Sequence, residues 1–250
     1  MSNWYFPAFA AHALEEQSRL VIASVKEFGL CVIPGFVDDA FCTMARDTID
    51  ALLNDERCKL WQDPLQADTR IMGVEHLASQ LNIFTQPLIN YVIRQLYNNA
   101  DLNGFVMAGK ITARPGNLGS GQGWHRDSVN EEQFKALLYL SDVDQLHGPF
   151  EYFLKTFSRR SMKAVERGYG IGLKQNRLTD DEISKLPANR RLTLCQKKGT
   201  LVIANTRAIH RGAPILCGER YALTTYSWTS AIPPHIGKFV NSNAALQGVS

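Results

Sequence analysis

The chain has few cysteines, and none of them forms a recognisable metal-binding or disulfide pattern. The five cysteines are an odd set with no C-x-x-C spacing. That argues against both a disulfide framework and a structural zinc site. We therefore expect most of them to be small buried side chains in a protein of a reducing compartment.

Long apolar runs and blocks of a single charge are also missing. The longest apolar runs, such as 30–37, fall far short of the roughly 20 residues that span a bilayer. The first residues carry neither the basic region nor the apolar core of a secretory signal. The net charge is only +3, without a basic block that could follow a phosphate backbone. The sequence therefore predicts a cytoplasmic protein with no membrane span and no nucleic-acid partner.

What the chain does contain is enough apolar material for a sizeable core. With 250 residues, 45% of them hydrophobic, and no internal repeat or linker, we expect one domain over 1–250. Apolar residues at helical spacing are concentrated in the first part of the chain, 1–100, which we expect to be helical. Three helices are predicted there: one at 10–28, one that Asp38 or Asp39 caps and that runs to 53, and one at 86–97. A short strand is expected at 30–33.

The pattern of apolar residues changes after residue 100. Short apolar runs bounded by Gly, Pro, Asp or Asn now follow one another, which is typical of a sandwich or barrel. The fold class predicted is mainly β with flanking helices, with the barrel core at about 101–230. The predicted strands are 104–114, 135–140, 150–154, 192–195, 201–204 and 221–228.

A polar insertion at 159–187 separates two of these runs. It contains one helix start, at Thr179, where Glu182 completes a capping box. An insertion of this length covers a site or forms mobile surface, and the sequence leaves both readings open.

The most informative stretch is the glycine-rich segment 121–127, which contains His125-x-Asp127. On a strand, residues i and i+2 point to the same face, so the imidazole and the carboxylate converge. A site with one imidazole nitrogen and one carboxylate oxygen as ligands suits a non-heme Fe(II) ion better than a zinc ion of the kind that thiolates bind. The alternative is a capped strand end with unrelated histidines.

His210 is the candidate for a third ligand, because it follows a strand and precedes another about 85 residues after His125. Two histidines and one carboxylate leave one face of the metal open for a co-substrate and O2. Arg220 opens the next strand, and inside a barrel it would need an anion, which a dicarboxylate could supply through a bidentate fork. The alternative for Arg220 is a surface salt bridge. Of the remaining histidines, His12 and His76 are expected on the surface and His235 on a loop.

Taken together, these residues resemble the phytanoyl-CoA dioxygenase family of Fe(II)/2-oxoglutarate oxygenases. The resemblance runs through most of the chain. It is carried by 27–37, 114–116, 121–127 and 198–201, followed in order by His210 and Arg220.

This resemblance implies a double-stranded β-helix (a jelly-roll, cupin-like core) with iron held by His125, Asp127 and His210. It also implies Arg220 on the distal carboxylate of 2-oxoglutarate and Thr112 as a polar contact of that co-substrate. Because Asp127 is present, hydroxylation or a related oxidation is expected rather than halogenation.

The chain departs from the family at two points. The Pro-Gly-Ser-His turn that relatives often carry is absent after 148–154. Gly212 also stands where a Ser or Thr is frequent.

The predicted substrate is a small polar molecule with a lean towards an anion. Lys110, Trp124 and Arg126 are candidate substrate residues, and the cations Arg159, Arg160 and Lys163 are candidates to cover the site. The alternative for the cations is solvated surface.

Two other function classes stay open. One is a cupin-like isomerase or zinc hydrolase, although such sites usually use three or more nitrogen ligands and the chain has no H-x-H pair. The other is a non-catalytic metal-binding barrel. The sequence carries no signal for oligomeric state.

Overall fold

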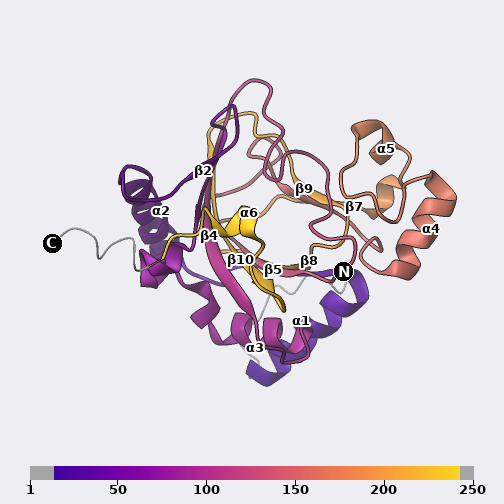
Figure 1. The fold of residues 1–250 in the computed structure, drawn as a ribbon, viewed down its shortest axis with the longest axis horizontal. Helices are drawn as coiled ribbons and strands as arrows, with labels where there is room; N and C mark the ends of the chain where they lie inside the picture. Colours follow the sequence, from indigo (N-terminus) through magenta and orange to yellow (C-terminus); the bar gives the residue numbers. More distant parts are fainter. Residues whose placement is uncertain (1–13, 243–250) are drawn as a thin grey trace.

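Three layers make up the structure, a computed structural model in which residues 14–242 are described: helices, a large sheet and a small sheet (Figure 1). The large antiparallel sheet has the strand order β1-β8-β5-β10-β4-β3-β2, and the small one the order β7-β6-β9. Among these residues no helix is both long and apolar enough to cross a bilayer.

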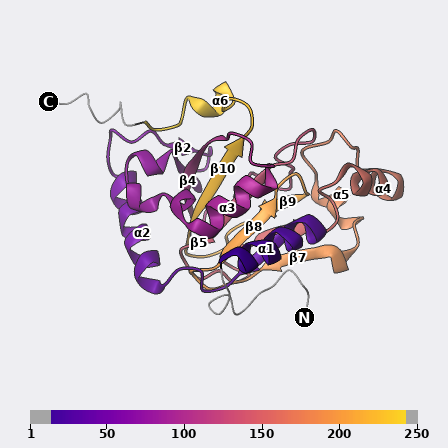
Figure 2. The ribbon, with the colours of Figure 1, turned by 90° about the horizontal axis from the view of Figure 1, so that it is seen from below.

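Three helices, α1 (Leu14–Phe28), α2 (Asp39–Leu53) and α3 (Pro87–Leu96), cover one face of the large sheet, and Figure 2 looks onto α1 and α3. Each begins or ends at a sequence signal. The side chain of Asp38 caps α2 by accepting from the amide of Phe41, and Pro87 starts α3. Gly29, with φ +93°, ends α1 and turns the chain into the first strand.

The large sheet is built around β10, which pairs with β4 on one side and β5 on the other. Antiparallel pairing lets each strand present alternate residues to two faces. The strands are β1 (Leu30–Ile33), β2 (Trp61–Gln62), β3 (Asp68–Met72), β4 (Asn103–Thr112), β5 (Phe134–Tyr139), β8 (Leu201–Asn205) and β10 (Glu219–Trp228).

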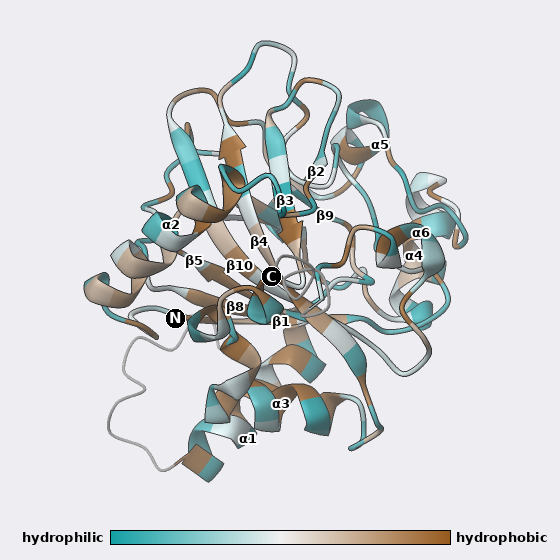
Figure 3. Ribbon diagram, turned by 60° about the vertical axis from the view of Figure 1, so that its left-hand side comes forward, coloured by the Kyte–Doolittle hydropathy of each residue, from teal (hydrophilic) through white to brown (hydrophobic). Residues whose placement is uncertain are grey.

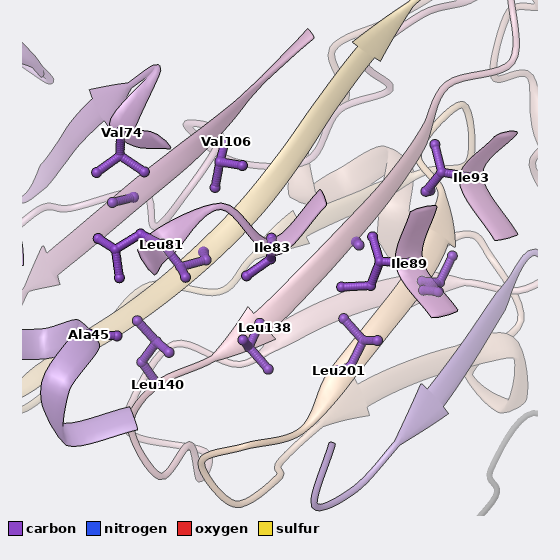
Figure 4. Packing of buried hydrophobic residues seen from close by; sticks show 14 of the residues in the cluster. Ala45, Val74, Leu81, Ile83, Ile89, Ile93, Val106, Leu138, Leu140 and Leu201 are labelled. Atoms are coloured by element: carbon purple, nitrogen blue, oxygen red, sulfur yellow. The ribbon is translucent and has the colours of Figure 1, made fainter. Parts of the chain in front are cut away.

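The main core lies between this sheet and the helices. It joins apolar residues of the strands, such as Val106, Leu138 and Leu201, to Ile89 and Ile93 of α3, all at most 1% exposed. Figure 4 shows these side chains packed together, and Figure 3 shows hydrophobic and hydrophilic residues on the same helices, as one-sided burial requires. The core therefore fixes one face of the sheet and leaves the other for a site.

The small sheet packs on that other face. It consists of β6 (Phe150–Phe153), β7 (Arg191–Leu194) and β9 (His210–Gly212). A second core joins Phe150 and Tyr152 of β6 to Tyr139, Val202 and other residues of the large sheet. The functional side chains lie where the two sheets open away from this core.

Two peripheral segments complete the fold. The insertion carries α4 (Arg159–Tyr169) and α5 (Asp180–Ser184) beside the small sheet, and α6 (Pro234–Gly237) lies in front of β4 and β10 (Figure 1). Four short 3-10 helices, η1 (Val74–His76), η2 (Ser79–Leu81), η3 (Ile83–Thr85) and η4 (Ala188–Arg190), connect other elements.

The mainly β architecture with flanking helices is confirmed. The helices expected at 39–53 and 86–97 and the six strands expected after residue 100 are present within one or two residues. The helix expected from residue 10 begins at Leu14, and 10–13 and His12 lie outside the described residues.

Two expectations need correction. The first 100 residues contain two strands, β2 and β3, besides the expected strand at 30–33, and the insertion has a second helix, α4. Strand β3 has the sequence Asp-Thr-Arg-Ile-Met, which begins with three polar residues and so lacks the apolar pattern by which strands are recognised.

Candidate metal centre

Two paired backbone segments bring the histidines together. The amide of His125 donates to the carbonyl of His210 and the reverse bond also forms, each at 2.9 Å. The amide of Asp127 donates to the carbonyl of Thr206 at 3.0 Å. Because side chains alternate along such a pair, His125, Asp127 and His210 all face one point, with potential ligand atoms within 4.8 Å of one another.

The hydrogen bonds of the imidazoles direct the same nitrogen of each ring to that point. Nδ1 of His125 lies 2.8 Å from the carbonyl of Gly123, and Nδ1 of His210 lies 2.9 Å from the carbonyl of Ala208. A carbonyl only accepts, so Nδ1 carries the proton and the lone pair of Nε2 is free. Each Nε2 lies 3.5 Å from an oxygen of Asp127.

The charge states also suit metal ligands. Burial, with a smaller contribution from His125, lowers the pKa of His210 to about 3, so its ring is neutral near pH 7. Burial alone would raise the pKa of Asp127, but Lys135 and the two histidines hold it well below its ordinary value. The neutral ring of His210, the ionised Asp127 and the imidazole of His125 make up two nitrogen donors and one carboxylate, the ligand set of a divalent metal with open coordination positions.

Lys135 of β5 is part of this centre. Its Nζ lies 2.6 Å from Oδ2 of Asp127 and 3.8 Å from the ring centroid of Tyr226, and its side chain is 8% exposed. Oδ2 is buried, yet no donor in residues 14–242 gives it a hydrogen bond of ordinary geometry. A buried carboxylate beside two free Nε2 atoms fits a bound cation, with Lys135 as a second positive group on Oδ2.

The glycine loop before His125 is shaped around the imidazole. Gly121 has φ +83°, and a Cβ there would stand 2.1 Å from Cε1 of His125. Gly119 has φ +74°, and a Cβ there would stand 2.2 Å from the carbonyl oxygen of Gly212. Only glycine allows both the left-handed backbone and the contact.

Arg220, at the start of β10, is the buried cation of the site. It is 6% exposed, and within the described part of the chain no carboxylate forms an ion pair with its guanidinium. Burial lowers its pKa below the ordinary value, partly offset by Tyr139 and Asp68. A buried guanidinium without a carboxylate is costly unless a ligand supplies the anion.

Gly212 makes the space that Arg220 uses. A Cβ on Gly212 would lie 3.0 Å from Nη2 of Arg220 and 2.7 Å from Cβ of Ser120. The hydroxyl of Ser120 is in turn 3.5 Å from Nη2 of Arg70. The departure at Gly212 therefore has a physical reason: the neighbouring loop fills the position with Ser120.

All of these side chains open into one cavity of about 380 Å³, within the range of small-molecule sites. Arg220 and Tyr226 lie on the same face of β10 and are six residues apart, so the cavity extends about 20 Å along the strand. Its lining includes four cations, Arg70, Lys135, Arg177 and Arg220, and one carboxylate, Asp127.

Thr112 and Lys110 are on the wrong face of β4 for the expected roles. Phe105 and Met107 point into the cavity. Lys110 instead pairs with Asp50 and Glu219, at 3.0 and 3.2 Å, and the hydroxyl of Thr112 lies 3.5 Å from Glu219. Neither residue lines the cavity, because alternation along the strand turns both away.

Trp124 and Arg126 are also outside the cavity, because they alternate with His125 and Asp127. Nε1 of Trp124 donates to Asp180 at 3.1 Å, and its ring lies in tilted contact with that of Phe153, with centroids 5.3 Å apart. Arg126 is 2% exposed and donates to the carbonyls of Arg207 and Leu173. Both side chains tie the segment with His125 and Asp127 to the rest of the fold, and neither lines the cavity.

The cations of the insertion divide into two groups. Arg159, Arg160 and Lys163 line a separate hollow on α4, together with Arg167 and Leu173. Sequence reasoning missed the insertion residue that does reach the cavity, Arg177.

Other residues of the cavity lining were not predicted either, and four of them carry polar or aromatic side chains of interest. Lys135 stands in a predicted strand and could have been noticed as a charge among apolar residues, whereas Arg70 lies on the unrecognised β3. His235 was expected on a loop and lies on α6 at the cavity's edge, and Trp61 stacks under Arg70 at 4.5 Å. His76 lies at the surface as expected.

No family model and no curated protein matches the chain. Solved structures do. The carbocyclase SnoK, a non-heme α-ketoglutarate-dependent enzyme from nogalamycin biosynthesis, superposes with a TM-score of 0.64 at 18% identity, covering 89% of this chain and 86% of that one.

Two other similar structures were determined with ligands. The epimerase SnoN, in complex with Fe3+, α-ketoglutarate and nogalamycin RO, gives a TM-score of 0.62 at 14% identity, covering 85% of this chain and 84% of that one. HygX from Streptomyces hygroscopicus, with nickel and 2-oxoglutarate bound, gives a TM-score of 0.60 at 15% identity, covering 84% of this chain and 86% of that one. The chain therefore shares the fold of these non-heme, 2-oxoglutarate-binding proteins.

Proposed function

We propose that the chain is an Fe(II)- and 2-oxoglutarate-dependent dioxygenase. It oxidises an unactivated C–H bond of a small molecule, by hydroxylation or a related reaction, with release of succinate and CO2. The observation that carries the proposal is the pairing of a His125/Asp127/His210 cluster with a buried, unpaired Arg220 in one cavity.

Each group has a distinct task in this proposal. The three ligands hold iron, which when bound supplies the activation of O2 and the oxidation of 2-oxoglutarate. Arg220 receives the distal carboxylate of 2-oxoglutarate, a bidentate contact for which guanidinium geometry is suited. The walls of the cavity exclude water from the reacting bond.

The fold neighbours support the class of cofactor. SnoK and SnoN are α-ketoglutarate-dependent, and HygX was solved with 2-oxoglutarate. One is a carbocyclase and one an epimerase, so proteins of this fold include enzymes of ring closure and of inversion. The resemblance to phytanoyl-CoA dioxygenases stays a prediction at the family level.

Anaerobic titration with Fe(II) and 2-oxoglutarate tests the proposal. We expect a weak visible charge-transfer band. In Arg220→Met the 2-oxoglutarate concentration for half the band should rise at least ~30-fold, because one partner of a buried charged pair is lost. Arg114→Met is the matched control, since Arg114 is exposed just beyond β4 and does not line the cavity.

The opposite results separate the alternatives. Tight zinc binding without a band with Fe(II) would favour the zinc hydrolase or isomerase class. A band that Arg220→Met leaves unchanged would remove Arg220 from the co-substrate site while keeping the metal centre.

A further inference from the structure

The insertion contributes a strand-like segment to the metal centre. The amide of Arg126 donates to the carbonyl of Asn176 at 2.8 Å, and the amide of Leu178 donates to the carbonyl of Trp124 at 3.1 Å. Arg177 lies between these bonds and is paired with His125 across the bridge. Both residues line the cavity. The insertion therefore carries one side chain to the place where the metal would bind.

Arg177 is held in position but not neutralised. Its Nη1 donates to the carbonyls of Gly121 and Gln122, and in the described range 14–242 no carboxylate pairs with it. It is exposed although it lines the cavity, so it lies at the mouth. The remaining N–H groups of its guanidinium are available to a ligand entering there.

Two other cations of the cavity have negative partners in the chain, whereas Arg177 has none in the described residues. Arg70 is paired with Asp68 through short contacts, and Lys135 with Asp127. In the proposed enzyme the distal carboxylate of 2-oxoglutarate is the partner of Arg220. Arg177 then remains the positive group of the cavity without a partner.

The far wall has the opposite character. Phe105 and Tyr226 stack with ring centroids 5.4 Å apart, and Met72 and Met107 lie beside Phe105 in the same apolar cluster. Isoleucine and phenylalanine side chains of the α6 region, Ile236 and Phe239, close this wall over the cavity. Such a surface binds an apolar group and offers few partners to a sugar hydroxyl.

We infer that the substrate has an apolar body, bound against Phe105, Tyr226 and Phe239, and one anionic group held by Arg177 at the mouth. The inference rests on the proposed function and narrows its substrate class. The anion is therefore recognised by Arg177, which lines the metal cavity, and not by the cations of α4, which line a separate hollow.

Matched acids and amides test this inference on the complete chain loaded with Ni(II) and 2-oxoglutarate, which does not turn over. The probes are phenylacetate, 4-phenylbutyrate and 2-naphthylacetate, each with its neutral amide, and glucose 6-phosphate as an anion without an apolar body. Binding is measured by calorimetry for the unaltered chain, for Arg177→Gln and for Arg190→Gln. Arg190 is an exposed arginine that does not line the cavity.

We expect at least one aromatic acid to bind ~10-fold or more tightly than its amide, because one charged contact contributes a difference of that size. The same acid should also bind more tightly than glucose 6-phosphate. Arg177→Gln should reduce the acid-to-amide ratio to ~2-fold or less, and Arg190→Gln should keep it. The inference is wrong if no aromatic acid binds, if amides bind as well as acids, or if Arg177→Gln preserves the ratio. A missing charge-transfer band with Fe(II) would instead overturn the proposed function, so the two failures can be told apart.

Discussion

Replacing Gly121 by alanine should remove His125 from the metal site while leaving most of the fold intact. A Cβ at this position would stand 2.1 Å from Cε1 of His125 and 2.9 Å from both ring nitrogens. Ordinary contact between carbon atoms needs about 3.5 Å, so the ring must move by more than an ångström. A displacement of that size takes Nε2 out of bonding distance of a metal held by Asp127 and His210.

Two effects contribute to the expected result, and Gly123 allows them to be separated. Gly121 and Gly123 have nearly the same left-handed backbone, with φ +83° and +85°, but a Cβ on Gly123 has no neighbour within 4 Å. In each variant the backbone costs about 1–2 kcal/mol of unfolding free energy. Only Gly121→Ala adds the collision with the imidazole.

Urea unfolding and metal titration by calorimetry, with Co(II) as the probe, measure both quantities. Gly123→Ala should lose about 1–2 kcal/mol of unfolding free energy and keep its metal affinity. Gly121→Ala should bind Co(II) at least ~100-fold more weakly, corresponding to about 2.7 kcal/mol. Equal metal affinity of the two variants would refute the placement of His125 as a ligand.

Three other predictions concern charge and space around the centre. Lys135→Met should lower the unfolding free energy of the metal-free protein by about 3–5 kcal/mol, because it leaves Asp127 as an unpaired buried charge. Metal should restore most of that loss. The pKa of His210 is about 3 in the folded chain and near 6.5 in an unfolded one. Between these pH values only the unfolded state gains the proton, so the stability of the metal-free protein should fall as pH is lowered, by up to roughly 1.4 kcal/mol per unit. Gly212→Ala should weaken 2-oxoglutarate binding by crowding Arg220 at 3.0 Å.

Each of these has its own control. Lys197→Met removes an ion pair with Asp142 that is 86% and 53% exposed, and should cost at most about 1 kcal/mol. A His210→Gln chain should lose the slope between pH 3 and 6.5, and an unchanged slope would assign it to other groups. Adding Ser120→Gly to Gly212→Ala removes the 2.7 Å contact with Cβ of Ser120 but leaves the 3.0 Å contact with Nη2 of Arg220, so 2-oxoglutarate binding should stay weak. Full recovery in this double variant would assign the loss to Ser120 and not to Arg220.

The convergence of His125, Asp127 and His210 on one point was predictable from the sequence because the rule behind it is local. His125 and Asp127 are two residues apart on an extended segment, which alone places them on one face. The pairing with His210 follows from antiparallel strands and was confirmed by a mutual pair of backbone hydrogen bonds. Helices with clear caps, such as the one that Asp38 begins, were predictable for the same reason.

The same rule shows why Trp124 and Arg126 were wrongly expected to line the substrate site. If His125 and Asp127 face the cavity, their neighbours must face away, and both do. This correction was available from the sequence. Lys110 is different, because β4 is mostly buried on both faces and its pattern does not say which face meets the cavity.

Other parts of the site depend on contacts between distant segments. Arg70 and Arg177 lie 55 residues before and 52 residues after His125, on a short polar strand and inside an insertion. Nothing in their local sequence indicates a site. They reach the cavity because β3 pairs with β4 and because 176–178 pairs with 124–126.

The hydrogen bonds of the two histidines have a consequence for how the protein is prepared. Each Nδ1 bonds to a carbonyl only two residues earlier in the chain, that of Gly123 or Ala208. Both rings are therefore oriented by their own stretch of backbone as soon as the strands form. Chelators should strip the ion without unfolding the chain, and one purified batch can be reloaded with iron, cobalt or nickel for parallel spectroscopic and crystallographic work.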